Sequence, residues 1–431
     1  MRMNNWSGHL VWSPDKTAHP SSEEEIRELV LHALENGKNI RTIGAGHSFT
    51  SLCETDDILV SLDHYQGLIA VDKNKMTATV RAGTRLYLLN ELLFAQGMAL
   101  ENLGDIDQQS IAGAAGTGTH GTGAALGNIS TLIRAIRLID GKGETRECSP
   151  EKEPQLFRAA QVSLGALGII TEITLQCVPA FNLELQIGKT GLEEVIRSFP
   201  ELNARNKHFE YYWFPHSGYA MTKKLNPTDE MEEKEGFGNF VQEYVLENYG
   251  FQLMCDLSRW IPSATPGLSR FSGRTVGPYR KVSRSYKAFC TRRLVRFNEM
   301  EYSIPLAAYG DVMKEIAGVV NRQFRSILFP IESRVVQGDD IPLSPAYARD
   351  SAYIACHVYH KKDFRAFFTR LEDIFRAADG RPHWGKIHNL QHRQYAEAYP
   401  DFQAFDAIRR QCDPEGVFLN AFLRSVFGIS A

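Results

Sequence analysis

Residues 41–50, RTIGAGHSFT, constrain the fold of this chain more than any other stretch. A run predicted as a strand, 40–43, leads into Gly44-Ala45-Gly46, and a lone histidine, His47, follows. Two glycines within three residues let the backbone turn tightly and approach a ligand closely, because neither carries a Cβ. A Rossmann dinucleotide site needs a third glycine and then a helix, and this stretch has neither. The turn is therefore not of the Rossmann class; it either faces a ligand or is an ordinary turn with a surface histidine.

A second unusual stretch, 101–123 (ENLGDIDQQSIAGAAGTGTHGTG), is dominated by small residues in its second half. A flexible linker is one interpretation of such a composition. However, Leu100 and Leu103 flank its start, and a predicted strand, 132–139, follows it. A run of small residues between ordered elements favours backbone that lies flat against a ligand.

The length of 431 residues predicts two domains, because a single core rarely grows that large. The net charge of -3 gives no reason to expect nucleic acid as a partner. No apolar run is long enough to span a bilayer, and the N-terminus lacks the apolar segment of a secretory signal. The seven cysteines are scattered without a CxxC pair, which suits a reducing compartment and predicts a cytoplasmic protein.

The hydrophobic pattern predicts a mixed α+β first domain that ends near Pro179, followed by a second domain. A capping box, Ser21 with Glu24 or Ser22 with Glu25, begins the first helix. The predicted helices are 26–34, 86–95, 311–323 and 363–378, and the predicted strands are 40–43, 58–62, 68–71, 77–80, 132–139, 169–178, 208–214, 300–305, 327–330, 334–336 and 353–359. The strand 208–214 is rich in aromatic residues, which predicts either core or the wall of a substrate cleft.

Two runs of like charge interrupt the second domain. Residues 229–235 (DEMEEKE) are acidic, and 269–297 carry nine arginines or lysines without an acidic residue. Such runs are usually solvated surface. A contact with an anionic surface is the alternative interpretation.

Several residues are candidates for chemistry. Glu332 and Arg334 lie two apart on a predicted strand and so share a face, whereas Ile331 and Val335 point to the opposite, buried face. A surface ion pair is the alternative, and Lys386 could simply pack its stem on Trp384. Five histidines could converge on a metal, but no paired ligand motif supports that, so single hydrogen bonds are favoured and no metal is predicted: His47, His120, His357, His383 and His388.

Five stretches taken together resemble the sugar-1,4-lactone oxidases, a family of the vanillyl-alcohol-oxidase flavoproteins. They are GAGHSFT, ENLGDIDQQSIAGAAGTGTHGTG, FPIESR with GDDIPLSPAYARDS, RPHWGKIHN and DPEGVFLNAFL. The resemblance implies an α+β fold with a two-subdomain FAD-binding domain (PCMH type) over 1–178. It further implies a cap domain with a large antiparallel sheet flanked by helices over 179–375, and a C-terminal segment, 376–431, that returns to close the active site.

The resemblance also implies roles for particular residues. His47 matches the histidine that bonds to the flavin 8α-methyl, and no cysteine in 104–123 offers a second tether. Glu332, Arg334 and Lys386 match the catalytic and substrate-binding positions, and His357 matches a substrate-binding histidine. Besides His47, the implied FAD-binding residues are Ile43, Gly44, Ala45, Gly46, Ser48, Gly104, Gln109, Ser110, Gly113, Gly116, Thr117, His120, Gly121, Ile169 and Lys386.

The implied reaction is oxidation of an aldono-1,4-lactone at C2, with hydride transfer to flavin N5 and an ascorbate-type product. Gly104 stands where lactone dehydrogenases often have alanine, which favours O2 as electron acceptor and H2O2 as product. An alditol oxidase acting on a polyol, a lactone dehydrogenase, a metal-dependent lactonase and a non-catalytic flavin-binding protein are the alternatives. Peripheral contact with a membrane stays compatible with the sequence.

Overall fold

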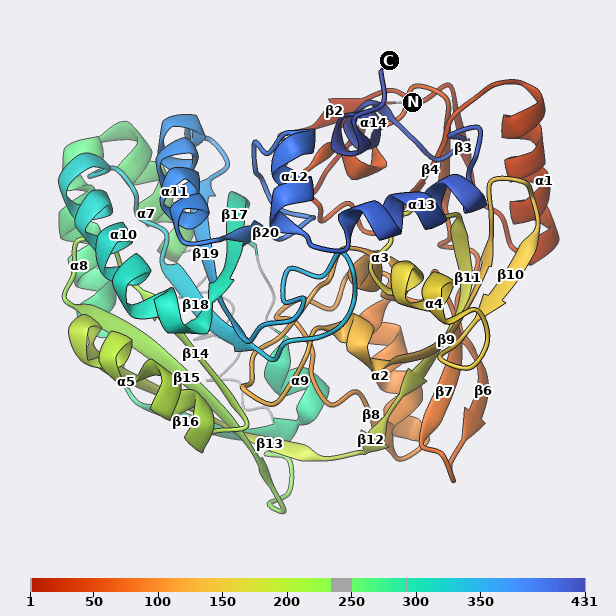
Figure 1. The fold of residues 1–431 in the computed structure, drawn as a ribbon. Coiled ribbons are helices and arrows are strands. Elements are labelled where there is room, and N and C mark those ends of the chain that lie inside the picture. Colours follow the sequence, from red (N-terminus) through yellow and green to blue (C-terminus); the bar gives the residue numbers. More distant parts are fainter. Residues whose placement is uncertain (1, 234–249, 291–293, 431) are drawn as a thin grey trace.

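The computed structural model describes residues 2–233, 250–290 and 294–430. The chain forms two halves that lie side by side, with the N-terminal half on the right in Figure 1. Parts of the two charge runs, 234–235 and 291–293, fall outside the described residues. Among the described residues, no helix combines the length and apolar character needed to cross a bilayer.

The N-terminal half contains two principal sheets. The first has three parallel strands in the order β3-β5-β4, with the bounds Lys16–Ala18, Ile58–Ser61 and Ile40–Ile43. The second has five strands in the order β10-β9-β11-β7-β6, with the bounds Thr145–Cys148, Ile133–Ile139, Ile169–Gln176, Thr77–Arg81 and Leu68–Asp72. Two short pairs add β1 (Met3–Asn4) with β2 (Val11–Trp12) and β8 (Met98–Ala99) with β12 (Val178–Pro179).

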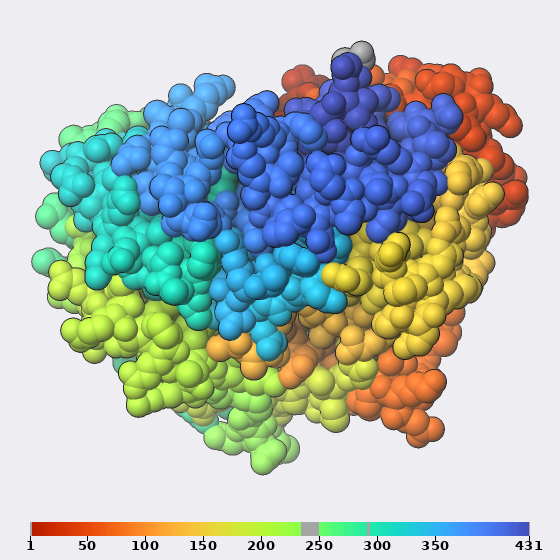
Figure 2. All heavy atoms as spheres, in the orientation of Figure 1, coloured from red at the N-terminus to blue at the C-terminus, as the bar shows by residue number. Residues whose placement is uncertain are grey.

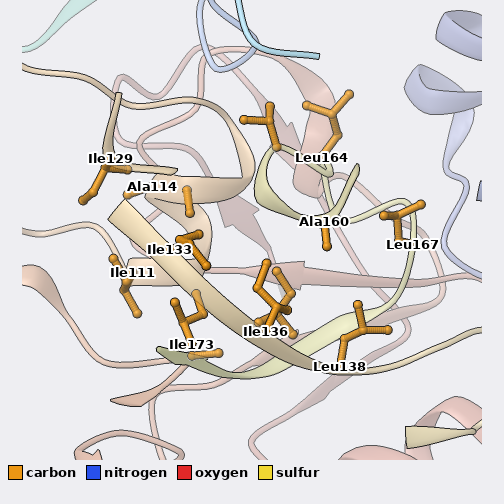
Figure 3. Close-up of a cluster of buried hydrophobic side chains, with 14 of the residues drawn as sticks. Ile111, Ala114, Ile129, Ile133, Ile136, Leu138, Ala160, Leu164, Leu167 and Ile173 are labelled. Atoms are coloured by element: carbon orange, nitrogen blue, oxygen red, sulfur yellow. The ribbon is translucent and has the colours of Figure 1, made fainter. Parts of the chain in front are cut away.

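Four helices belong to this half: α1 (Glu23–Glu35), α2 (Leu86–Ala95), α3 (Ile111–Gly116) and α4 (Pro154–Gln161). Ser22 is the N-cap of α1, since its Oγ accepts the Glu25 backbone N–H, but the Glu25 carboxylate accepts the N–H of Ser21 rather than that of Ser22, so the predicted capping box is only half formed. In Figure 3, apolar side chains from α3, α4, β9 and β11 meet in one core. This core therefore holds α3, which belongs to the glycine-rich stretch, against α4 and the five-stranded sheet.

The other half is built on one antiparallel sheet of eight strands in the order β16-β13-β15-β14-β18-β19-β17-β20. Their bounds are β13 Asn182–Gly191, β14 His208–Trp213, β15 Tyr219–Thr228, β16 Tyr279–Arg284, β17 Phe297–Pro305, β18 Ile331–Val336, β19 Ser351–Tyr359 and β20 Arg381–Pro382. Among the described residues, the α-helices of this half are α5 (Leu192–Arg205), α7 (Gly250–Trp260), α8 (Thr265–Thr275), α9 (Ser285–Phe289), α10 (Tyr309–Gln323) and α11 (Arg365–Ala377).

The central strands of this sheet are buried on both faces, but the two faces differ in chemistry. Successive side chains of a strand point to opposite faces. On one face, apolar side chains pack in a single cluster with α5, α10 and α11: Phe209, Tyr211, Met300, Tyr302, Ile331, Val335, Ile354 and Cys356. Their neighbours on the same strands point to the other face and include six buried ionisable side chains: Glu210, Glu299, Glu301, Glu332, Arg334 and His357. The predicted split of Glu332 and Arg334 from Ile331 and Val335 is therefore confirmed.

The C-terminal segment contains α12 (His392–Ala398), α13 (Phe402–Cys412) and α14 (Ala421–Phe427). Its apolar side chains join the core of the N-terminal half, and Asn420 donates to the carbonyl oxygens of Ser51 and Glu54, each at 2.7 Å. In Figure 2 this segment (darkest blue) begins in the upper middle of the molecule and extends over the N-terminal half. The segment therefore links the half built on the eight-stranded sheet to the N-terminal half.

The two charge runs contact each other. Arg280 pairs with Glu230 and Glu233, and Glu232 pairs with Arg284 and Lys287. The described charged side chains of both runs are exposed or half-buried, as expected of solvated surface, but they partly neutralise one another. This pairing weakens the alternative that the basic run serves an anionic surface.

One expectation about local structure was wrong, and one helix was not predicted. Residues 327–330 form no strand, because the chain turns there before β18 begins at Ile331. The small-residue stretch contains the helix α3, which its glycine content did not suggest. Ser110 caps this helix by accepting the Gly113 N–H, and buried Ile111, Ala114 and Ala115 anchor it in the core.

Candidate flavin pocket and charged sheet face

A pocket with about 960 Å³ of empty space, its open mouth included, lies in the N-terminal half. It is lined by the end of β4, the glycine turn, α3 and the residues before β11. The volume lies at the upper end of the range typical of small-molecule sites. Twelve of the residues expected to bind FAD line it: Ile43, Gly44, Ala45, Gly46, His47, Ser48, Gln109, Ser110, Gly113, Gly116, Thr117 and Ile169.

The glycines of this pocket are needed because two backbone segments approach each other closely. A Cβ built on Gly44 would lie 2.5 Å from Ser110 Oγ, and one on Gly113 would lie 2.9 Å from the same atom. Gly46 has a φ of +67°, in the left-handed region that favours glycine. The turn and the start of α3 therefore form a cradle with exposed backbone that a side chain would fill.

His47 lies at the pocket with its ring stacked on Trp6, at a centroid distance of 5.4 Å. Burial, and then the nearby positive charges of Lys386 and Arg85, lower the pKa of His47 to about 4. At neutral pH the ring is therefore uncharged and keeps a nitrogen lone pair. A lone pair is what bond formation to an electrophilic carbon requires.

The loop after β20 joins this pocket to the charged face of the eight-stranded sheet. Phe49 N–H donates to Gly385 O at 2.7 Å, and Thr50 Oγ1 donates to Trp384 O at 2.8 Å. Trp384 is fully buried, and its indole N–H donates to Leu343 O at 2.7 Å. These bonds hold Lys386, which follows Gly385, between the glycine turn and the sheet.

Lys386 places its Nζ 2.5 Å from Glu299 Oε2 on β17 and 5.4 Å from the ring centre of Phe49. Burial alone would lower the pKa of Lys386, but Glu299, Glu301 and Asp105 outweigh burial and raise it. The same pairing counteracts the effect of burial on Glu299, and the pKa of that carboxyl falls to about 2. Lys386 is thus a fixed ammonium group rather than a packed stem.

Arg334 lies at the centre of a second buried ion network. Its Nε is 2.8 Å from Glu210 Oε2 on β14, its NH2 group contacts Glu332, and Asp105 lies 3.7 Å away. Lys223 on β15 pairs with Glu210 at 2.8 Å. Burial would raise the pKa of Glu210, but Lys223 and Arg334 lower it to about 2. The guanidinium is therefore held rigidly, with Glu332 beside it on the same strand.

His357 on β19 faces Glu299, with its Nε2 3.5 Å from Glu299 Oε1. Its Nδ1 is 3.1 Å from the carbonyl oxygen of Pro330. His357 and Lys386 thus contact the same carboxylate. Residues predicted from three distant stretches, Glu332 with Arg334, His357 and Lys386, meet on one face of the sheet.

Four residues expected at the flavin lie outside the pocket lining: Gly104, His120, Gly121 and Lys386. A Cβ on Gly121 would lie 2.3 Å from Leu103 O, so this glycine serves close backbone packing. His120 pairs with Glu301, with Nε2 and Oε1 3.2 Å apart. All four lie between the pocket and the sheet or on the sheet's charged face, rather than in the cradle.

Within the described chain, His120, Glu301 and His383 form the one group whose arrangement could hold a metal ion. His383 Nδ1 accepts the Gly385 N–H at 3.0 Å, so a neutral His383 ring carries its proton on Nε2. A protonated nitrogen cannot bind a metal. The group is therefore better described as a hydrogen-bonded cluster than as a metal centre.

Sequence reasoning did not identify several residues of the site. Glu210 was placed in an aromatic strand expected to be core or cleft wall, Glu299, Glu301, Asp105 and Lys223 were given no role, and His383 was expected only to form a single hydrogen bond. The signal for the glutamates was a charge at every second position of strands whose alternate positions are large and apolar, as in Glu299 and Glu301 around Met300. The run 163–168 before β11, to which no role was assigned, also lines the pocket through Ser163, Leu164, Gly165 and Gly168.

Comparison with known proteins first defines the class. Residues 14–149 match a family model described as an FAD binding domain. The fold is similar to that of a solvent-stable cholesterol oxidase, with a TM-score of 0.85, 17% identity and 99% and 97% of the two chains covered. A chitooligosaccharide oxidase gives a TM-score of 0.72 at 15% identity. The protein is therefore a flavoprotein with an FAD-binding domain and a cap built on a large antiparallel sheet.

The family follows from the remainder of the chain. Residues 173–426 match the model described as D-arabinono-1,4-lactone oxidase. The L-gulono-1,4-lactone dehydrogenase of Mycobacterium tuberculosis is 38% identical over 426 residues, with 99% of both chains covered. The L-gulonolactone oxidase of Bos taurus is 31% identical, with 99% of this chain and 98% of the relative covered. The chain belongs to the sugar-1,4-lactone oxidase and dehydrogenase family.

FAD is the cofactor, and the cradle fits it. The close approach of the Gly44 turn to Ser110 leaves backbone, rather than side chains, to face a bound group. Backbone N–H groups suit a pyrophosphate because they donate without adding bulk. When bound, FAD supplies an acceptor for a hydride.

Proposed function

We propose that this protein oxidises an aldono-1,4-lactone of the L-gulono type at C2. The observation that most supports this proposal is the position of Lys386. Hydrogen bonds to the carbonyl oxygens of Trp384 and Gly385 hold it between the flavin pocket and a buried charged face. The names of the relatives, which act on gulono- and arabinono-lactones, support the choice of substrate. The proposed domains are 1–178 for FAD, 179–375 for the cap and 376–431 for the returning segment.

In the proposed reaction the substrate hydroxyl loses its proton while the carbon loses a hydride. Lys386 donates a hydrogen bond to the hydroxyl oxygen, where its fixed positive charge stabilises the negative charge that develops. Glu332 accepts the proton, because a carboxylate can do so and a charged ammonium cannot. Arg334 keeps a planar donor beside Glu332 and offsets negative charge at the substrate. We propose that His357, which lies opposite Glu299, contacts the same substrate.

Anaerobic mixing of the holoprotein with L-gulono-1,4-lactone, D-arabinono-1,4-lactone and xylitol tests this function. We expect the lactones to bleach the flavin absorbance faster than xylitol does. Faster bleaching by xylitol supports the alditol oxidase instead. A flavin that none of the three reduces contradicts the proposal.

We propose that the flavin is tethered through His47. The neutral imidazole at the pocket supports this bond. Acid-precipitated wild-type protein is expected to keep its yellow colour, and His47→Ala is expected to release the flavin into solution. His9→Ala, at a histidine away from the pocket, serves as the control and should keep the colour. Flavin released from the wild type contradicts the tether.

We propose O2 as electron acceptor, with H2O2 as product; a dehydrogenase is the second candidate, since one relative at 38% identity carries that name. In this proposal, the residue at position 104 determines whether the reduced flavin reacts with O2, as in an oxidase, or not, as in a dehydrogenase. A Cβ at Gly104 would lie 3.3 Å from His120 O and 3.4 Å from Thr119 Cγ2, so even a methyl group there is tight.

Gly104→Ala is expected to slow the reaction with O2 by about tenfold, which corresponds to about 1.4 kcal/mol in the barrier. Anaerobic reduction by lactone should stay near the wild-type rate, because Lys386 and Glu332 are unchanged. The measurement is O2 consumption beside reduction of an artificial dye. Gly310→Ala, where a Cβ meets nothing within 4 Å, is the matched control. Wild-type protein that reduces the dye but consumes no O2 supports the dehydrogenase.

A further inference from the structure

Glu299 and Glu301 are two buried carboxylates that the sequence motifs do not include. They lie on the same face of β17, 6% and 3% exposed. Glu299 Oε1 is 3.5 Å from His357 Nε2, and Glu301 Oε1 is 3.2 Å from His120 Nε2. Each carboxylate thus faces one ring nitrogen of a histidine from another part of the chain.

The other nitrogen of each ring fixes where its first proton lies. His120 Nδ1 is 2.9 Å from Gly121 O, and His357 Nδ1 is 3.1 Å from Pro330 O. A carbonyl oxygen only accepts, so both Nδ1 atoms carry a hydrogen and donate it. In a neutral ring, Nε2 would then present a lone pair to a carboxylate that also has only lone pairs to offer. One further proton in each pair turns this repulsion into a hydrogen bond.

The charge balance of the sheet face also indicates two additional protons. Five carboxylates meet there: Glu210, Glu299, Glu301 and Glu332 are buried, and the Asp105 side chain is 21% exposed. Three permanently charged cations pair with them: Lys223, Arg334 and Lys386. The negative charges exceed the positive ones by two, and an unbalanced buried charge is strongly unfavourable.

Neighbouring histidines do not change this balance. Burial lowers the pKa of His383 to about 3 and that of His47 to about 4, so both rings are neutral near pH 7. His208, at the far end of β14, is also neutral, because burial lowers its pKa to about 4. Two additional protons on the His120–Glu301 and His357–Glu299 pairs bring the buried face to neutrality.

We propose that Glu299 and Glu301 are positioning residues that each hold one proton in common with a histidine, Glu299 with His357 and Glu301 with His120. Glu299 uses its second oxygen to bind Lys386 Nζ at 2.5 Å. The first pair therefore keeps Lys386 charged and directed. The statement about Lys386 rests on the proposed function, whereas the two shared protons do not.

Protonation can be read directly in holoprotein with 15N-labelled histidine. We expect NMR to show the shared proton of each pair on Nε2, or infrared spectroscopy to show it as a protonated carboxyl group. His120→Asn and His357→Asn assign the ring signals. Glu301→Gln should remove the proton of the His120 pair alone, and Glu299→Gln that of the His357 pair alone. Neutral rings together with no carboxyl band that either variant removes overturn the proposal.

A second readout concerns Lys386 in the working enzyme. Because Glu299 raises the pKa of Lys386, Glu299→Gln should lower that pKa. The high-pH limb of kcat, where Lys386 loses its proton, should therefore move to lower pH. Glu372→Gln is the matched control, since Glu372 is buried on the apolar side of the sheet, where it accepts from Tyr302.

The limb should stay in place in Glu372→Gln. If Glu299→Gln also leaves the high-pH limb of kcat at the wild-type pH, the role assigned to Glu299 is wrong. If the protein oxidises no lactone, the proposed function fails, and the NMR measurement still decides the question of the two protons.

Discussion

Replacing Lys386 with methionine is expected to slow anaerobic flavin reduction by lactone by about 10²-fold or more, the usual effect of removing one charge-stabilising donor. Methionine keeps an unbranched stem of similar length, so the change removes the ammonium group with little loss of packing. The ion pair with Glu299, at 2.5 Å, is lost with it. Stopped-flow absorbance in the absence of O2 measures the reduction step alone.

Lys314→Met is the control for Lys386→Met, because Lys314 lies on α10 with 69% of its side chain exposed. It should reduce the flavin at the wild-type rate. Lys386→Arg keeps a positive charge near Glu299 and should retain more activity than Lys386→Met. Reduction of Lys386→Met at the wild-type rate would remove this residue from the catalytic machinery.

Arg334→Leu is expected to lower the free energy of unfolding by about 3–5 kcal/mol, the cost of removing one partner from a buried ion pair. It leaves Glu210 and Glu332 buried without the guanidinium that binds both. Flavin reduction by lactone should fall as well, because Glu332 loses its fixed neighbour. Urea unfolding followed by tryptophan fluorescence measures the first effect, and stopped flow measures the second.

The loss of stability caused by Arg334→Leu should be larger at neutral pH than in acid. The pKa of Glu210 is lowered to about 2 in the folded protein, below the ordinary value of about 4.3. The corresponding stabilisation is complete above the ordinary value and disappears as pH falls toward 2. The difference between wild type and Arg334→Leu should therefore be largest near neutral pH and shrink on acidification.

Two variants make the result for Arg334 interpretable. Arg205→Leu, on the exposed surface of α5, should change stability by less than about 0.5 kcal/mol. Arg334→Lys retains the positive charge but not the planar donor, so it should recover stability more than activity. An Arg334→Leu protein as stable as the wild type at pH 7 would contradict the buried network.

Local signals in the sequence predicted the part of the site that depends on neighbouring residues. Alternation on β18 placed Glu332 and Arg334 together, and the two-glycine turn predicted backbone that faces a ligand. The roles of these residues came from the resemblance to a family, not from spacing. The contact between Arg334 and Glu210 spans 124 residues of sequence, and no local pattern encodes which strand lies next to which.

The residues that were missed share one physical reason. Glu210, Glu299 and Glu301 lie on strands that are buried on both faces. A single acidic residue among large aromatic ones looks like an exposed position of a half-buried strand. Only the assembled sheet shows that the second face is covered by loops carrying Asp105 and His120. The helix α3 was missed because glycine lowers helix propensity, and a cap with core packing overrides that.

The division of the eight-stranded sheet into an apolar face and a charged face has a consequence for how such enzymes diversify. The apolar face packs against α5, α10 and α11 and supplies the folding energy of this half. The charged face is the proposed substrate side, and its residues occupy alternate positions of the same strands. Mutational drift at those alternate positions can change substrate preference while the folding core keeps its sequence. A directed-evolution library on the charged face should thus yield folded variants mainly where both partners of a buried ion pair are kept or replaced together.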